Sequence, residues 1–126
     1  MHCNDPNCSG NDENITSPDQ IMPVTGLFLL YRTIDLSLDS SGYPVLLCHD
    51  IEADPPKLKL MHCNDINCAD ADESIVTVDS NNFNTAFASL ALDSNGYPVI
   101  GYLDATSKDL RVTHCNDANC AGNLFN

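Results

Sequence analysis

Three copies of one short motif gather the residue types in this chain that could carry out chemistry. The motif reads HCNDPNC at residues 2–8, HCNDINC at 62–68 and HCNDANC at 114–120. Histidine, cysteine and aspartate are ligands of zinc, and a cysteine beside a histidine can act as a nucleophile with its base. Two cysteines can also close a disulfide. The motif therefore predicts a metal site, a catalytic cluster or a disulfide-closed turn.

The spacing of the cysteines favours disulfides. Six of the seven cysteines form pairs with the same short spacing, and Cys48 is left over. Such pairs predict local disulfides and an oxidising compartment. The expected disulfides are Cys3–Cys8, Cys63–Cys68 and Cys115–Cys120. The chain-entropy model gives about 2 kcal/mol for each of these short loops, and the Asn-Asp pair inside each loop suits turn and left-handed conformations.

The elements that must position the motif are predicted to be β-strands. DSSGYPV at 39–45 recurs as DSNGYPV at 93–99, with Asp and Gly placed for a type I turn followed by a glycine bulge. No segment shows a sustained helical period, so we expect almost no helix. The clearest strand segments are SIVTVD (74–79), SLALD (89–93), VIGYLD (99–104) and DLRVTHC (109–115).

The repeat predicts an all-β fold of propeller-type blades, each with four antiparallel strands, and about two blades per chain. The chain is expected to be one repeat domain, 1–126. Its expected parts are a partial blade with an insertion (1–28), a blade (29–80) and a blade lacking a full last strand (81–126). Because a propeller needs about 4 to 8 blades, we expect a longer array or a ring of copies. In such a ring, a strand near 12–17 would complete the last blade of the next copy.

Alternation along the strand before the motif separates its histidine from its cysteine. Leu110, Val112 and His114 share one face, which we predict to point inward, and Cys115 lies on the other. Leu58, Leu60 and His62 repeat the pattern. We therefore expect a histidine at the edge of the core, bonded to the turn or to a neighbouring backbone group. A metal site is the alternative, but none is predicted, since the spacing fits zinc only loosely.

A second group, Cys48, His49 and Asp50, also invites a catalytic interpretation. Neighbours on a strand point to opposite faces, so a Cys–His pair would need a histidine from elsewhere. Tyr102 occupies the slot of Cys48 in the other repeat, which predicts a small buried substitute. We predict no catalytic residue and no cofactor.

Two further sets of repeated residues lie at strand ends. The acids at these positions could bind calcium, but turn capping is the stronger prediction because no dense carboxylate loop is present. They are Asp39, Asp50, Asp93 and Asp104. Tyr43 and Tyr97 follow the turn glycines and are the speculative ligand-binding residues, with turn packing as the alternative.

Charge and hydropathy exclude other classes of function. Five Lys and Arg residues face 18 Asp and Glu, for a net charge of −13, which disfavours nucleic acid. No apolar run approaches the roughly 20 residues of a membrane span. The chain shows no signal peptide, but its cysteines predict an extracellular or periplasmic location.

SLALDSNGYPVIGYLD followed by LRVTHCNDANC resembles a repeat found in long tandem arrays of exported bacterial proteins that look like β-propellers. The resemblance covers about 33–120 well and 2–17 in part, and it is broken at 18–32 and at Cys48. A wider likeness is to sialidase-type propellers. Their catalytic set of arginines, tyrosine and acids cannot be placed here, because Arg32 and Arg111 are the only arginines.

These observations predict a non-enzymatic, exported propeller-type scaffold or binding module. The alternatives are a lectin-like glycan-binding ring and a fragment of a sialidase-like glycosidase. The expected partners are further copies of the chain or neighbouring repeats of a longer chain, with a glycan or protein as a possible ligand.

Overall fold

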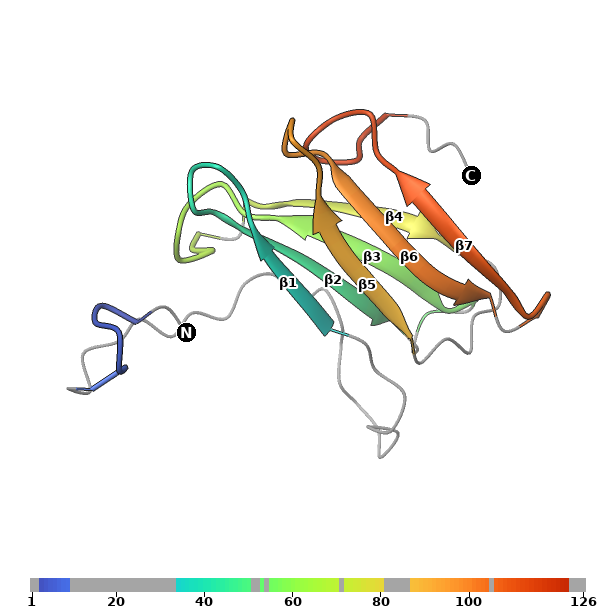
Figure 1. Cartoon of the computed structure of the whole chain (residues 1–126), viewed down its shortest axis with the longest axis horizontal. Coiled ribbons are helices and arrows are strands. Elements are labelled where there is room, and N and C mark those ends of the chain that lie inside the picture. The colour runs from blue at the N-terminus through green and yellow to red at the C-terminus, as the bar shows by residue number, and fades with distance from the viewer. Residues whose placement is uncertain are drawn as a thin grey trace.

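The computed structural model describes residues 3–9, 34–50, 53, 55–70, 72–80, 87–104 and 106–122. These residues form seven strands and no helix, arranged in two antiparallel sheets, neither of which closes into a barrel (Figure 1). The predicted all-β class is therefore confirmed. The strand expected near 12–17 and the beginning of the blade expected from residue 29 lie outside the described residues. In the described part of the chain, no helix is long and apolar enough to cross a membrane.

Each sheet is a simple meander in which consecutive strands pair. Sheet 1 has the order β1-β2-β3-β4, and sheet 2 has the order β5-β6-β7. The strands of sheet 1 are β1 (Ile34–Leu38), β2 (Pro44–Asp50), β3 (Lys57–His62) and β4 (Ser74–Asp79). Those of sheet 2 are β5 (Ala88–Leu92), β6 (Pro98–Asp104) and β7 (Asp109–His114). The four strand segments named from the sequence are thus confirmed to within a few residues.

The first hairpin of each sheet has the predicted turn. In sheet 1 the Gly42 N–H donates to the Asp39 carbonyl over 3.0 Å, and the Asp39 N–H donates to the Tyr43 carbonyl over 2.9 Å. Gly42 has a φ of 81°, which a residue with a side chain adopts only at a cost. The turn of sheet 2 repeats these bonds, and Gly96 has a φ of 80°.

The two sheets are structural copies with the same register. Val45 lies opposite His62 in sheet 1, and Val99 lies opposite His114 in sheet 2. We call the side of each sheet that carries this histidine the front face, and the opposite side the back face. Because residues directly opposite in an antiparallel pair share a face, every residue of sheet 2 has a counterpart on the same face of sheet 1.

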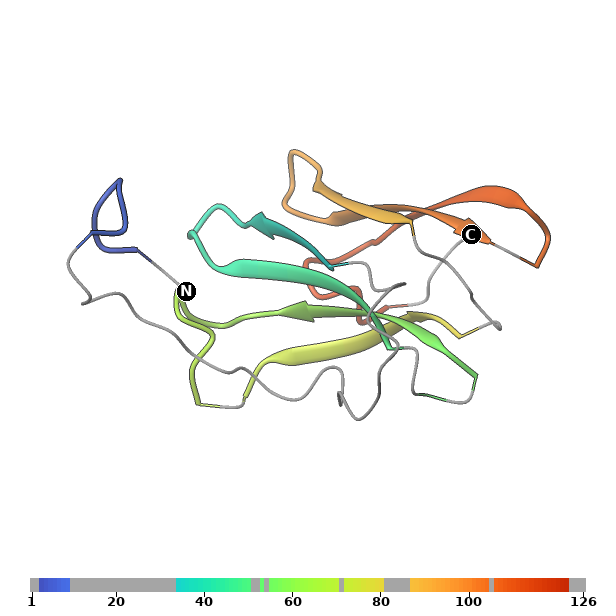
Figure 2. The same ribbon diagram turned by 90° about the horizontal axis from the view of Figure 1, so that it is seen from below.

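The core forms where the front face of sheet 1 packs on the back face of sheet 2. Figure 2 shows the two sheets as layers, and the first strands of the two sheets, β1 and β5, are close neighbours. The core residues from sheet 1 are Val45, Leu47, Leu58, Leu60 and Val78. Those from sheet 2 and the turn that follows it are Leu90, Ile100, Tyr102, Cys115 and Cys120. The sheets therefore stack front to back, in the same sense.

This stacking corrects one prediction about the faces. The side that carries Leu58 and Leu60 is buried, as expected. In sheet 2 the corresponding side is open to solvent, with Leu110 75% and Val112 56% exposed. The pattern of apolar residues is the same in both sheets, but among the described residues only sheet 1 has a neighbour on its front face. The prediction that His114 and its neighbours face inward is wrong.

Polar contacts also join the sheets. The Asp35 carboxylate on β1 accepts a hydrogen bond of 2.7 Å from the Leu90 N–H on β5, and this bond lowers the pKa of Asp35. The Tyr102 hydroxyl donates to Asp79 at the end of β4 over 2.6 Å. Arg111 contacts the same Asp79 carboxylate at 3.5 Å. Burial, and then the bond to Asp79, raise the pKa of Tyr102.

Candidate functional site

The three motif copies form the same disulfide-closed turn. The cysteines of each pair are bonded, with Cα–Cα distances of 5.0 Å for Cys3–Cys8, 5.1 Å for Cys63–Cys68 and 5.0 Å for Cys115–Cys120. Cys48 is the free cysteine, as predicted. Of the three interpretations of the motif, the structure therefore supports the disulfide-closed turn.

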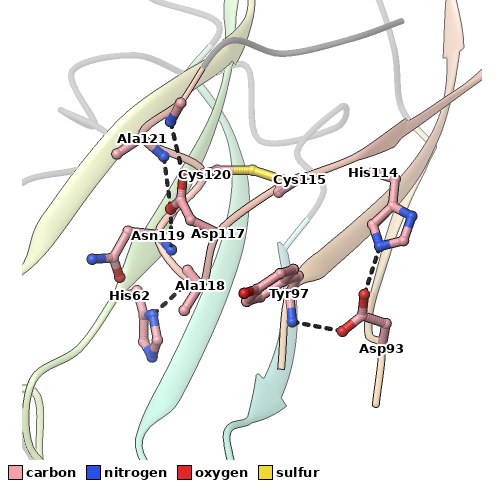
Figure 3. The surroundings of a disulfide bond; sticks show 11 residues. His62, Asp93, Tyr97, His114, Cys115, Asp117, Ala118, Asn119, Cys120 and Ala121 are labelled. Atoms are coloured by element: carbon pink, nitrogen blue, oxygen red, sulfur yellow. Dashed lines mark hydrogen bonds and ion pairs between the residues drawn. A yellow bond between two sulfur atoms is a disulfide. The ribbon is translucent and has the colours of Figure 1, made fainter. Parts of the chain in front are cut away.

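The aspartate of the motif holds this turn from inside. Asp117 Oδ1 accepts hydrogen bonds from the backbone N–H of Asn119 and Ala121, at 2.8 and 3.1 Å (Figure 3). These backbone bonds lower the pKa of Asp117. Asp5 and Asp65 receive the corresponding bond from the residue two positions on, at 2.7 and 2.6 Å. The carboxylate is thus a capping group in each copy.

The position of the left-handed residue differs from the prediction. We expected the Asn-Asp pair to adopt this conformation, but the second cysteine of each copy does so. The φ angles are 50° at Cys8, 50° at Cys68 and 54° at Cys120. The aspartate instead uses its side chain to accept backbone N–H groups, as in an Asx turn, and the backbone reverses at the disulfide.

The motif histidine binds the aspartate that begins the hairpin of its own sheet. His62 Nε2 lies 2.9 Å from Asp39 Oδ2, and His114 Nε2 lies 2.6 Å from Asp93 Oδ2. Figure 3 shows the second pair with the Asp93 carboxylate also bonded to the Tyr97 N–H. The residues are 23 and 21 positions apart in the sequence. The register of the three-stranded meander brings them together.

These contacts lower the pKa of both aspartates. Burial would raise the pKa of Asp39, but the hydrogen bonds from His62 and from the N–H groups of Tyr43 and Ser41 outweigh it. The Tyr97 N–H and then His114 hold down the pKa of Asp93. Both carboxylates are therefore charged at neutral pH. Turn capping by these two acids is confirmed, and their bond to histidine is an addition that the sequence did not indicate.

His62 also joins the two sheets. Its Nδ1 lies 2.9 Å from the carbonyl oxygen of Ala118, in the disulfide-closed turn of sheet 2 (Figure 3). The Ala118 carbonyl and the Asp39 carboxylate both accept hydrogen bonds, so each ring nitrogen of His62 faces an acceptor. This confirms the prediction of a histidine bonded to a backbone group. The group belongs, however, to the turn of the other repeat.

The Cys48-His49-Asp50 segment is arranged as a packed strand. Cys48 is 2% exposed, and burial raises the pKa of its thiol to about 12. Its Sγ donates to the Lys59 carbonyl over 3.8 Å. Cys48 lies opposite the first residue of β1, Ile34, and Tyr102 lies opposite the first residue of β5, Ala88. This register confirms that Cys48 and Tyr102 occupy the same position in the two sheets. A protonated, buried thiol is a poor nucleophile.

The acids at the ends of β2 and β6 bind a basic residue and cap a turn. Asp50 accepts from Lys59 Nζ over 2.7 Å, and Asp104 accepts from Arg111 over 2.7 Å. Asp104 also accepts the N–H groups of Thr106 and Ser107, and these bonds and Arg111 overcome the effect of burial and lower its pKa. Turn capping is confirmed here too. Among the described residues, no group of three or more His, Cys, Asp or Glu side chains could hold a metal ion.

Tyr43 and Tyr97 occupy equivalent positions after the turn glycines. Each backbone N–H donates to the capping aspartate over 2.9 Å, and each residue is half-buried. The end of each sheet therefore carries the same three groups, namely an Asp–His pair, a tyrosine and a disulfide-closed turn. We call this set the hairpin-end cluster. It is the candidate functional site, and ligand binding by the two tyrosines stays a prediction.

Comparisons with known proteins found no relative of this chain. No protein-family model matches the chain, and no curated protein or solved structure matches it.

Proposed function

We propose that this chain is a non-enzymatic, exported scaffold or binding module of β-propeller type, completed by further copies or by neighbouring repeats. The observation that carries the proposal is the stacking of the two sheets. The front face of sheet 1 packs on the back face of sheet 2, with the first strands β1 and β5 adjacent. Consecutive blades around a propeller axis meet in this way, with the same faces in contact each time.

The use of the titratable residues supports a structural role. The Asp–His pairs and the motif aspartates brace turns, and Asp104 holds Arg111. The free thiol of Cys48 is protonated, because its pKa is about 12. Three local disulfides support export to an oxidising compartment.

The second candidate is a lectin-like module, and the repeated hairpin-end cluster favours it. Tyr43 and Tyr97 are held by the same backbone bond in both sheets, so a ring would present them at regular intervals. A half-buried tyrosine offers both a ring face and a hydroxyl to a sugar. The cluster is therefore the surface on which binding should be sought.

A pair of engineered cysteines tests the blade-like stacking. Asp35 Oδ2 and Ser89 Oγ lie 3.3 Å apart across the two sheets. In a Cys48→Ser background, Asp35→Cys with Ser89→Cys should be linked within one chain by a short bifunctional thiol reagent. Asp35→Cys with Ser94→Cys, at the far end of the β5 hairpin, is the matched control and should remain unlinked. Equal linking of both pairs, or none at Ser89, would contradict the stacking.

A glycan array and a panel of glycosides test the function itself. The scaffold is expected to release no sugar from any glycoside, and turnover would contradict a non-enzymatic role. Binding that Tyr43→Ala and Tyr97→Ala both abolish would establish the lectin-like function. Tyr102→Phe is the control, because Tyr102 is buried between the sheets and is remote from the hairpin ends.

A further inference from the structure

Two apolar surfaces of the described residues are open to solvent, and each is the counterpart of a surface that the chain itself buries. The first is the front face of sheet 2, which carries Leu110 and Val112. The second is the β1 side of the back face of sheet 1, where Ile34, Leu36 and Leu38 are 64%, 56% and 59% exposed.

The core between the sheets shows what covers each of these surfaces. Leu36 on β1 corresponds to Leu90 on β5, because each lies opposite the third residue of the next strand. That residue is Leu46 in β2 and Ile100 in β6. Leu90 is only 8% exposed, because it packs in the core with Val45 and the rest of the front face of sheet 1. The back face of sheet 2 is thus covered by the front face of the preceding sheet, sheet 1. The open front face of sheet 2 corresponds to the front face of sheet 1, and the open β1 side of the back face of sheet 1 corresponds to the β5 side of the back face of sheet 2. These two corresponding surfaces meet in the core.

We propose that the front face of sheet 2 docks on the β1 side of the back face of sheet 1 in a second copy of the chain. The contact would repeat the part of the existing packing that β5 makes, with β1 of the second copy in the place of β5, and it therefore rests on the proposed blade-like function. Met61 and Cys48 at the centre of the back face are already buried. The second copy would meet the exposed β1 side.

The two histidines supply polar support for this contact. His62 and His114 make the same bond to their own hairpin aspartate, but only His62 has a described partner at Nδ1, the Ala118 carbonyl of the next sheet. The His114 side chain is 58% exposed. Ile66 is the counterpart of Ala118 and is exposed. In the proposed contact, His114 Nδ1 donates to the Ile66 carbonyl of the second copy.

The side-chain volumes of the two surfaces also compensate each other. On the front face, Gly101 of sheet 2 occupies the position that Leu47 occupies in sheet 1. On the back face, Ile34 of sheet 1 occupies the position that Ala88 occupies in sheet 2. A Cβ at Gly101 would meet nothing within 4 Å, so this part of the front face has room. At these two positions one surface loses bulk where the other gains it, so Gly101 and Ile34 together have nearly the combined volume of Leu47 and Ala88.

The contact joins different faces, so copies add head to tail and give a ring if the rotation closes. Each copy carries a net charge of −13, so repulsion opposes association at low ionic strength. Added salt screens this repulsion and should strengthen association.

Light scattering after size exclusion, with two blocking variants, tests the proposal. Leu110→Glu with Val112→Glu blocks the front face, and Ile34→Glu with Leu36→Glu blocks the back face. Each should weaken association by about 100-fold or more, because a carboxylate would be buried without a partner. Ser94→Glu with Asn95→Glu, at an exposed turn of sheet 2, is the control and should associate like the wild type. Near-ultraviolet circular dichroism checks that every variant is folded.

Mixing the two blocked variants then tests the direction of the contact. Each alone should have a mass of 13.7 kDa, and the mixture should form a one-to-one complex of twice that mass, because one intact front face meets one intact back face. Self-association of either variant alone would indicate a face-to-itself contact and overturn the proposal. A wild type that stays monomeric in high salt would also overturn it. After either of these outcomes, a cross-link between Asp35→Cys and Ser89→Cys within one chain would still support the proposed function.

Discussion

The two sheets present the same sequence pattern in two environments. Leu60 and Val112 occupy corresponding places on β3 and β7, yet Leu60 is fully buried and Val112 is open to solvent. Alternation fixes which side of a strand is apolar, but the neighbouring sheet fixes whether that side is covered. The same apolar strand face is therefore core in one repeat and surface in the other, according to whether another sheet of the described chain covers it.

The largest expected effect is a difference in stability between substitutions on the two front faces. Leu60→Ala should lower the free energy of unfolding by about 2 to 5 kcal/mol, because it leaves a cavity in the core. Val112→Ala should change it by no more than about 0.5 kcal/mol, because the side chain is exposed. Urea unfolding at high dilution measures both. Similar losses for the two variants would show that the two front faces have the same surroundings.

The disulfide-closed turns give the next effect. Replacing Cys115 and Cys120 by serine should cost about 2 kcal/mol in unfolding free energy, by the loop-entropy estimate. Thiol titration of the denatured wild type should find one free group, Cys48, which should resist alkylation in the native protein because of its burial and its raised pKa. Seven titratable thiols would contradict the three disulfides.

The hydrogen bond across the sheets gives a somewhat smaller effect. Tyr102→Phe should cost about 1 to 2 kcal/mol, since the hydroxyl donates to a charged Asp79 carboxylate. A double-mutant cycle with Asp79→Asn measures the coupling free energy between Tyr102 and Asp79 separately from the loss of the Arg111–Asp79 contact. Zero coupling would place Tyr102 and Asp79 apart in solution. Leu110→Ala, on the open face, is the control and should not couple to Asp79→Asn.

The smallest effect concerns pH. The pKa values of Asp39 and Asp93 lie below the ordinary value of 3.8 in the folded chain. Their bonds therefore stabilise the fold above pH 3.8, and this contribution is lost as the pH falls through the lowered values. Asp39→Asn should flatten the acid limb of the stability curve, measured by thermal unfolding between about pH 2 and pH 6. An unchanged acid limb would mean that the Asp39 bond is not made in solution.

Local features of the molecule could be predicted from the sequence. The strands, the glycine turns and the cysteine pairs depend on residues that are close in the chain, and alternation was enough to separate His114 from Cys115. The shared slot of Cys48 and Tyr102 followed from the repeat alone. These features need no knowledge of how the sheets pack.

Features that depend on the arrangement of the sheets could not be predicted. The Asp39–His62 bond needs the register of three strands, and the His62–Ala118 bond needs the stacking of two sheets. The one available signal was that both an aspartate and a histidine recur in each repeat. The open front face of sheet 2 was missed for the same reason, because a residue's own strand does not determine what lies opposite it.

The short span of the disulfides has a consequence for how the protein matures. The two cysteines of each pair are only five positions apart, so they meet far more often in the unfolded chain than cysteines of different pairs do. Each bridge can form before distant strands come together, and Cys48 rarely competes as a wrong partner. Under oxidising conditions the bridges can therefore form one repeat at a time, before the two sheets pack together.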